Sequence, residues 1–265
     1  MSTRLRHPFA PDRPMASERL DLALVQRGLA ETRSRARHLI EAGQVTVDGV
    51  TAVKPAAKVS QSQDIRLDDG ALRWASRAGL KLEHALDIFK IDPAGLACLD
   101  IGASTGGFTD VLLDRGALRV HAVDVGHGQL IPRLAEDDRV RVYERLNARH
   151  LTPETIGEPV GLVVSDVSFI SLRLALPQAL SCALPGARLV ALVKPQFEVG
   201  AARIGKGGIV RDEAARADAL RDVVSWLEND AGWTLLGQAE SPIFGSDGNQ
   251  EFLIAAEKTV IVSSS

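Results

Sequence analysis

The stretch LDIGASTGGFTDVLL, residues 99–113, decides the fold of this 265-residue chain. It begins with apolar residues typical of a buried strand, continues through a glycine-rich turn, and ends with the apolar spacing of a helix. Glycine lacks a Cβ and tolerates positive φ, so such a turn lets a ligand approach backbone N–H groups closely. The stretch therefore predicts a ligand-binding loop in an α/β domain.

The chain around this loop alternates predicted strands and helices. Strands are predicted at 97–102, 119–126, 140–148, 161–168, 187–194, 233–243 and 249–258, and helices at 76–89, 106–116, 171–184 and 212–229. Alternation with short connections favours a mostly parallel, doubly wound sheet. The last two strands are joined without a helix and predict an antiparallel pair at its end.

The segment before residue 68 predicts a separate small module. Ser17 can cap a helix that ends at Gly28, and a second helix ends at Gly43. A strand then turns at Asp48-Gly49, and residues 58–67 predict another short strand. Two helices and a small sheet would thus fill about 50 residues.

The net charge of −3 conceals an asymmetry between these two parts. Residues 1–66 hold eleven Lys and Arg against seven Asp and Glu, a net +4, whereas the rest holds 20 against 27, a net −7. Arg33 and Arg37 lie one turn apart on the second predicted helix, where planar guanidinium groups suit phosphates. From charge alone, a solvated basic face explains them equally well.

The remaining composition favours a cytoplasmic protein without membrane or metal partners. No apolar run approaches the roughly 18 residues of a membrane span. Cys98 and Cys182 lie far apart, so a disulfide scaffold and a zinc site are not expected. Residues 1–16 lack an apolar core and predict a disordered tail rather than a secretory signal, with Met15 as a second candidate start.

The spacing of the glycine-rich loop distinguishes between candidate ligands. Its pattern, D-x-G-x-x-x-G-G, lacks the G-x-G-x-x-G spacing of dinucleotide loops. It resembles the loop of class I methyltransferases, which holds S-adenosylmethionine; a dinucleotide loop and a simple packing turn are the alternatives. The resemblance implies a donor site formed by Asp100, Gly102, Ser104, Thr105, Gly106, Asp124, whose carboxylate would accept the ribose hydroxyls, and Asn147, near adenine.

Four charged residues lie where a cleft is expected. Asp166 and Lys194 end the fourth and fifth predicted strands, Glu251 begins the last one, and Lys81 lies on the preceding helix. Singly, each could be a helix cap or a surface charge. Together they suit removal of a proton from a ribose 2′-hydroxyl, if a second ammonium and partial burial lower the pKa of one lysine.

Several motifs closely resemble the TlyA family of ribosomal RNA 2′-O-methyltransferases, also called hemolysin A. They are SRAGLKLEHAL, LDIGASTGGFTDVLL, AVDVGHGQL, SDVSFISL, LVKPQFEVG and GNQEFL. The resemblance covers residues 17–257 and implies a Rossmann-like, seven-stranded class I methyltransferase domain of the FtsJ-like type. It also implies methylation of ribosomal RNA or ribosomal subunits, often on cytidine, with Lys194 as base, Asp166 and Lys81 as its tuners, and Glu251 as a positioning group.

The sequence from residue 17 to 67 resembles the S4 type of RNA-binding domain. This resemblance implies a small α+β module that binds RNA. Independently, the glycines of GKGGIVRD, residues 205–212 of the other domain, predict a mobile loop that closes over substrate. The predicted RNA contacts are Arg19, Arg33, Arg35, Arg37, Lys206 and Arg211.

These inferences divide the chain into a tail at 1–16, the small domain at 17–67, a linker at 68–76 and the catalytic domain at 77–265. The chain is expected to be a monomer. Two other functions stay open at this point: a ribosome assembly factor that binds RNA without catalysis, and a membrane-lytic protein. The absence of a long basic amphipathic helix argues against the second.

Overall fold

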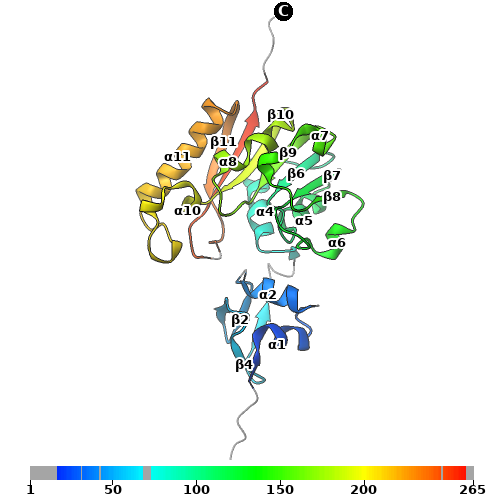
Figure 1. Ribbon diagram of the computed structural model, residues 1–265, viewed down its shortest axis with the longest axis vertical. Helices are drawn as coiled ribbons and strands as arrows, with labels where there is room; N and C mark the ends of the chain where they lie inside the picture. The colour runs from blue at the N-terminus through cyan, green and yellow to red at the C-terminus, as the bar shows by residue number, and fades with distance from the viewer. Residues whose placement is uncertain (1–16, 31, 42, 68–72, 246, 261–265) are drawn as a thin grey trace, which may run out of the picture. The chain divides into compact units, whose positions relative to one another are not determined.

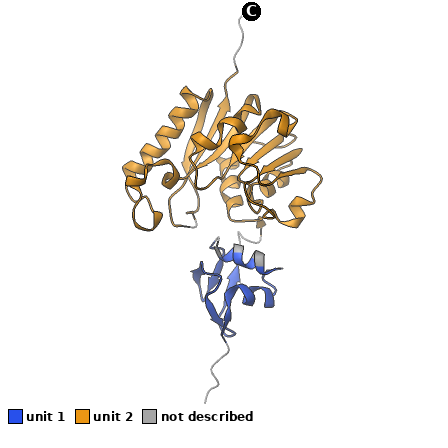
Figure 2. Cartoon of the chain, in the orientation of Figure 1, with its two compact units in different colours: residues 1–69 blue, residues 70–265 orange. Residues whose placement is uncertain are grey.

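The computed structural model describes residues 17–30, 32–41, 43–67, 73–245 and 247–260. The predicted tail and most of the predicted linker lie outside these ranges. The chain forms two compact units, residues 1–69 and 70–265, coloured separately in Figure 2. No helix among the described residues is both long and apolar enough to cross a bilayer.

In its described part, residues 17–67 without 31 and 42, the first unit combines two short helices with two small antiparallel sheets. Its elements are β1 (Ser17–Arg19), α1 (Leu20–Gln26), α2 (Arg33–Glu41), β2 (Val45–Val47), β3 (Val50–Ala52), β4 (Lys58–Ser60) and β5 (Ile65–Leu67). β1 pairs with β4, while β2 lies between β3 and β5. Leu20, Leu24 and Ile40 are fully buried between the helices and strands.

The second unit contains one large sheet and two layers of helices. Its strands are β6 (Ala97–Ile101), β7 (Arg119–Val123), β8 (Val140–Tyr143), β9 (Val160–Ser165), β10 (Ala183–Val193), β11 (Trp233–Glu240) and β12 (Phe252–Lys258). Among the described residues its helices are α4 (Ala78–Phe89), α5 (Gly107–Asp114), α6 (Pro132–Ala135), α7 (Pro153–Ile156), α8 (Leu172–Ala175), α9 (Pro177–Ser181), α10 (Pro195–Glu198) and α11 (Glu213–Asn229), with 3₁₀ turns η1 (Ala148–His150), η2 (Ala201–Arg203) and η3 (Lys206–Gly208).

The sheet order is β11-β12-β10-β9-β6-β7-β8, with β6 to β10 parallel and β12 antiparallel to both of its neighbours. This confirms the predicted seven-stranded, mostly parallel α/β sheet. Apolar side chains of α4, α5 and α6 pack on one face of the sheet, and those of α8, α9 and α11 pack on the other. Figure 1 shows the ribbon of this unit, with helices flanking the sheet. Strand residues alternate between the two cores because successive side chains point to opposite faces.

Several element boundaries differ from the sequence prediction. Ser17 does not cap a helix, because residues 17–19 pair with β4 and the helix begins at Leu20. The helix predicted at 171–184 is divided at Pro177, whose ring cannot continue the preceding hydrogen-bond ladder. The strand predicted at 58–67 is two strands, β4 and β5, separated by a turn.

The predicted linker also ends earlier than expected. Trp74 and Ala75 are buried in the core of the second unit, at 4% and 1% exposure. The Ala75 N–H donates to Asp110 at the start of α5, over 2.7 Å. The large apolar surface of Trp74 explains why this segment packs rather than crossing solvent.

The sheet topology brings distant segments to one edge. Residues after β6, β9 and β10 leave the same edge because these strands are parallel. β12 runs the other way, and its first residue, Phe252, pairs with Val193 at the end of β10. This register places Glu251 next to Lys194, although 57 positions separate them in the sequence.

Candidate active site

The glycine-rich loop after β6 has three residues with left-handed backbone conformation. Gly102, Ser104 and Gly106 have φ values of 87°, 48° and 99°. The N–H groups of Gly102 and Ala103 both donate to the carbonyl of Val123, at 2.9 and 3.2 Å. The loop therefore turns tightly over the end of β7.

Gly102 also lies against the turn that follows β9. A Cβ added there would meet the Asp166 carbonyl oxygen at 2.8 Å, closer than real Cβ contacts. Only glycine combines this close approach with positive φ. The glycine-rich loop and the turn at Asp166 are thus in direct backbone contact at Gly102.

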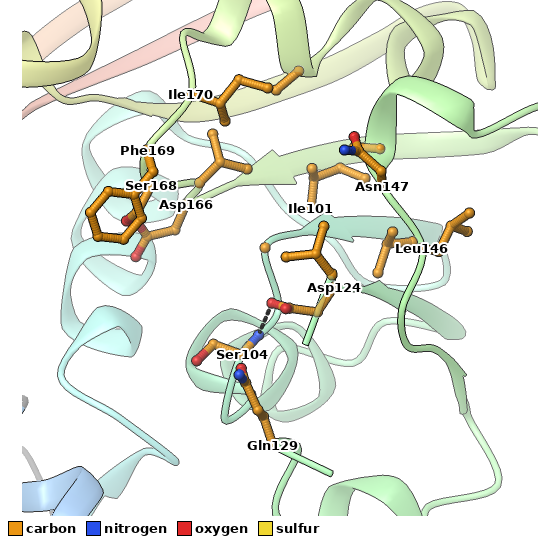
Figure 3. Close-up of a pocket in the computed structure, with 16 residues that line it drawn as sticks. Ile101, Ser104, Asp124, Gln129, Leu146, Asn147, Asp166, Ser168, Phe169 and Ile170 are labelled. Atoms are coloured by element: carbon orange, nitrogen blue, oxygen red, sulfur yellow. Dashed lines mark hydrogen bonds between the residues drawn. The ribbon is translucent and has the colours of Figure 1, made fainter. Parts of the chain in front are cut away.

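Asp124, at the end of β7, organises the same loop. Its Oδ2 accepts the Ser104 N–H at 2.8 Å, and its Oδ1 accepts the Gly126 N–H at 2.7 Å. Figure 3 shows the first of these bonds beneath the pocket. Each carboxylate oxygen keeps a second lone pair that can accept a ligand hydroxyl.

A pocket of about 490 Å³ opens over the loop. In Figure 3, Leu146 and Asn147 lie on one side of it, Asp166, Ser168 and Phe169 on the other, and Asp124 between them. The pocket combines apolar walls with a few polar groups, as small-molecule sites do. Its lining is Ile101, Gly102, Ser104, Val123, Asp124, Val125, Gln129, Leu146, Asn147, Ala148, Asp166, Val167, Ser168, Phe169, Ile170 and Ala175.

Four of the seven predicted donor-site residues line this pocket: Gly102, Ser104, Asp124 and Asn147. Asp100, Thr105 and Gly106 do not. Asp100 is fully buried below the loop and accepts a 2.7 Å hydrogen bond from Thr109 Oγ1. Burial raises the pKa of Asp100 to about 7, against the opposing effect of the Thr109 hydrogen bond.

The four predicted charged residues form two ion pairs at the same edge of the sheet. Lys194 Nζ lies 2.6 Å from Asp166 Oδ1, and Lys81 Nζ lies 2.5 Å from Glu251 Oε2. All four side chains are largely buried, with exposures from 3% to 14%. The structure thus brings together residues that span 170 positions of sequence.

The expected lowering of the Lys194 pKa is wrong for the free site. Burial lowers this pKa, but the carboxylates of Asp166 and Glu251 outweigh burial, and the net direction is upward. The second ammonium, on Lys81, is itself paired with Glu251. Burial raises the pKa of Asp166, yet Lys194 and Lys81 bring it below its ordinary value.

A second pocket, of about 390 Å³, adjoins the first. Ser168 and Phe169 line both pockets and therefore mark the boundary between them. Phe169 is 91% exposed, has a φ of 65°, and tilts against Phe197 with 5.2 Å between ring centroids. The second pocket is lined by Ser168, Phe169, Lys194, Gln196, Phe197, Ile204, Gly208, Asp247 and Glu251.

Asn249 joins the loops around the second pocket. Its Nδ2 donates to the Gly208 carbonyl at 3.0 Å and to Asp247 Oδ2 at 2.9 Å, and its Oδ1 accepts the Val210 N–H at 2.9 Å. Gln196 donates to the same Asp247 oxygen at 3.1 Å. The loop predicted to be mobile is thus hydrogen-bonded to Asn249, in the segment that precedes Glu251 and β12.

The predicted RNA-binding arginines of the first unit are partly engaged within it. Asp21, whose side chain is fully buried, accepts two hydrogen bonds from Arg19 at 2.9 Å and one from Arg33 at 3.0 Å. The Arg19 hydrogen bond is the main cause that lowers the pKa of Asp21 to about 2. Arg37 is exposed, and the Arg35 side chain lies outside the described part.

Lys206 and Arg211 are exposed on the segment beside the second pocket. Sequence reasoning did not identify Ser168, Phe169, Gln196 or Asn249. The sequence feature that could have identified these four residues is that each lies within two or three positions of Asp166, Lys194 or Glu251. The combined arrangement offers one pocket for a small molecule, a second pocket that adjoins it, and a lysine–aspartate pair whose lysine lines the second pocket and whose aspartate lines the first.

Comparisons with known proteins agree on both units. The model of the FtsJ-like methyltransferase family matches residues 74–258, and that of the S4 domain matches residues 18–65. The 16S/23S rRNA (cytidine-2′-O)-methyltransferase TlyA of Mycobacterium tuberculosis is 51% identical over 237 residues, covering 89% of this chain and 88% of the relative.

Two further relatives carry the hemolysin name. Hemolysin A of Brachyspira hyodysenteriae is 41% identical over 89% of this chain and 98% of its own length. A solved structure of a protein from Streptococcus thermophilus, also described as a hemolysin, is 43% identical with a TM-score of 0.73. It covers 93% of this chain and 90% of that one.

Proposed function

This chain belongs to the FtsJ-like methyltransferase family, in the TlyA group that also carries an S4 domain, and on that premise we propose that it methylates ribosomal RNA. The reaction is methyl transfer from S-adenosylmethionine to a ribose 2′-hydroxyl, on cytidine. The observation that carries the proposal is the pair of adjoining pockets with a lysine–aspartate pair at their boundary. A ribosomal substrate places the reaction in the cytoplasm.

The residues of the first pocket fit the methyl donor. The left-handed glycine loop lets a ligand approach its backbone without side-chain obstruction. The N–H groups of Gly102, Ala103 and Ser104 donate within the protein, so polar contact with the donor would come from Asp124, which keeps free lone pairs for the ribose hydroxyls. Asn147 Oδ1 accepts the Arg149 N–H, which leaves its Nδ2 group to donate to an adenine. When bound, the donor supplies an electrophilic methyl group on a positively charged sulfur.

The second pocket suits the acceptor nucleotide. Lys194 and Glu251 line it, and Phe169 and Phe197 present an aromatic pair on which a base can stack. Lys194 would accept the proton that the 2′-hydroxyl loses as it attacks the methyl group. Asp166 orients the amine, while Lys81 and Glu251 neutralise each other and hold the strand end in place.

The unit with the S4 domain supports an RNA substrate. Its helix α2 carries Arg33 and Arg37, and Lys206 and Arg211 lie exposed beside the acceptor pocket. Phosphate contacts by such residues dominate RNA affinity and make it depend on salt. Ribosomal subunits are the proposed partners.

The test is transfer of labelled methyl groups from S-adenosylmethionine to separated ribosomal subunits. Lys194→Ala should lose at least about 100-fold in rate, as expected for loss of a general base, with donor binding retained. Lys90→Ala removes an exposed lysine at the end of α4 and serves as the matched control. If the wild-type protein binds the donor but labels no ribosomal RNA, the non-catalytic assembly role replaces this proposal.

A further inference from the structure

The amine of Lys194 has two polar neighbours from the same turn. Nζ lies 2.6 Å from Asp166 Oδ1 and donates to Ser168 Oγ at 2.8 Å. The lysine side chain is 10% exposed, so solvent reaches little of it. Ser168, in contrast, is exposed and lines both pockets.

These neighbours define the geometry of the nitrogen. A tetrahedral amine nitrogen has four directions, and Cε occupies one of them. Ser168 accepts an N–H of this nitrogen, and the Asp166 carboxylate, which can only accept, attracts a second N–H as the ion-pair partner of the amine. One direction then remains, and in the neutral amine it belongs to the lone pair.

We propose that Ser168 is a positioning residue for Lys194, which with Asp166 fixes both N–H bonds so that the lone pair faces the acceptor pocket. The proposal rests on the methyltransferase function inferred above. With Asp166 as sole anchor, the amine could still rotate about the Cε–Nζ bond between staggered wells. Ser168 removes that freedom, and the lone pair is oriented before the acceptor hydroxyl arrives.

Three features constrain the backbone of the turn that carries Ser168. Phe169, the next residue, has left-handed φ, a conformation that persists only where surrounding contacts enforce it. Glu198 accepts the Ser171 hydroxyl at 2.6 Å and the Leu172 N–H at 2.8 Å, which fixes the end of the turn. Gly102 packs against its beginning.

The remaining direction on Lys194 matches the acceptor side. Lys194 lines the second pocket but not the first, whereas Asp166 lines the first but not the second. Ser168 stands between them. The 2′-hydroxyl proton would therefore pass from the acceptor nucleotide in the second pocket to Lys194, while the methyl group would arrive from the first pocket.

The test compares Ser168→Ala with Ser168→Thr, which keeps the hydroxyl, and the exposed position gives the added methyl room. Single-turnover methyl transfer is measured across pH at saturating donor and RNA. Ser168→Ala should lower the limiting rate about 5- to 50-fold, as misorientation does, while Ser168→Thr stays within about 3-fold of wild type. Donor and RNA affinity should change less than about 2-fold in both.

The pH dependence separates positioning from loss of structure. The Ser168 oxygen stabilises the ammonium, so its removal should lower the pKa of Lys194 and move the acid limb of the rate profile to lower pH. Partial unfolding would lower the rate at every pH without shifting the profile. Loss of positioning should instead lower the limiting rate and make the rate rise at a lower pH. Ser181→Ala, which removes an exposed hydroxyl from α9, is the matched control.

An NMR titration of the Lys194 amine provides a readout without donor or RNA. It keeps the proposal testable even if no ribosomal RNA is methylated, an outcome that would overturn the proposed function alone. An unchanged Lys194 pKa in Ser168→Ala would overturn the positioning role. So would wild-type turnover by Ser168→Ala at every pH, or equal losses in Ser168→Ala and Ser168→Thr.

Discussion

Gly102→Ala should damage catalysis far more than it damages folding. The added Cβ would lie 2.8 Å from the Asp166 carbonyl oxygen, 3.1 Å from its carbonyl carbon and 3.3 Å from Val167 Cα. All three are backbone atoms that cannot rotate away. Restoring ordinary contact, from 2.8 Å to at least 3.4 Å, requires a shift of about 0.6 Å between the binding loop and the Asp166 turn.

The backbone strain of this substitution can be measured separately. A non-glycine residue in left-handed conformation costs roughly 1–2 kcal/mol. Gly157 has a φ of +79° with no atom within 4 Å of an added Cβ, so Gly157→Ala carries the strain without the collision. For a domain of about 150–250 residues, 1 kcal/mol corresponds to a Tm loss of about 2–4 °C.

The expected results differ in kind. Gly157→Ala should lower Tm by several degrees and keep wild-type methyl transfer. Gly102→Ala should lose about 10- to 100-fold in single-turnover rate, because sub-ångström displacement of reacting groups has effects of that order. Calorimetry should also show weaker donor binding. If Gly102→Ala loses no more activity than Gly157→Ala, the close contact between Gly102 and the Asp166 backbone has no catalytic role.

Methyl transfer should rise with pH into the alkaline range, because the raised pKa of Lys194 keeps the base protonated near neutrality; a plateau already reached at neutral pH in single-turnover assays would contradict this. Asp21→Asn should lower the Tm of the first unit. The lowered pKa of Asp21 means that its stabilisation is complete above about pH 4 and is lost as pH falls toward about 2, which melts of both proteins against pH would show. Asn249→Asp keeps the acceptor for Val210 N–H but turns an oxygen toward the Gly208 carbonyl. Hydrogen exchange should accelerate in residues 205–210 only, and uniform acceleration would indicate general destabilisation instead.

The strand–loop–helix unit and the sheet class follow from the sequence because both depend on local patterns. Alternating apolar segments, glycine turns and short connections specify a parallel sheet without knowledge of distant contacts. The helix divided at Pro177 shows the limit of this reasoning. Apolar periodicity continues through residue 184, yet the helix is divided at Pro177 and ends at Ser181, and β10 already begins at Ala183.

Details of the site depend on pairings that no local pattern encodes. The register of Val193 with Phe252 sets Glu251 beside Lys194, and a slip of one residue would turn Glu251 to the other face. The direction of the Lys194 pKa was mispredicted for a related reason. The sequence shows two lysines and two acids, but only the structure shows which acid neutralises which lysine.

Pairing between distant residues also changes how the arginines of the first unit are interpreted. The helical spacing predicts Arg33 as a phosphate contact, yet its side chain donates to buried Asp21. Substitution of Arg33 would therefore reduce stability as well as RNA affinity. RNA affinity at several salt concentrations should therefore be measured together with Tm for Arg33→Ala and for Arg37→Ala, so that loss of binding is separated from loss of stability.

The insertion of β12 between β10 and β11 has a consequence for synthesis of the chain on the ribosome. Every residue that lines the donor pocket lies between Ile101 and Ala175, whereas Glu251 is made 76 residues later. At about 5–20 residues per second, that interval lasts roughly 4–15 seconds. A growing chain can thus present the walls of the donor pocket while the sheet still lacks the strand that brings the last charged residue. With the role proposed for Glu251, the residues that would bind the donor are made before the residues that would carry out methyl transfer are complete.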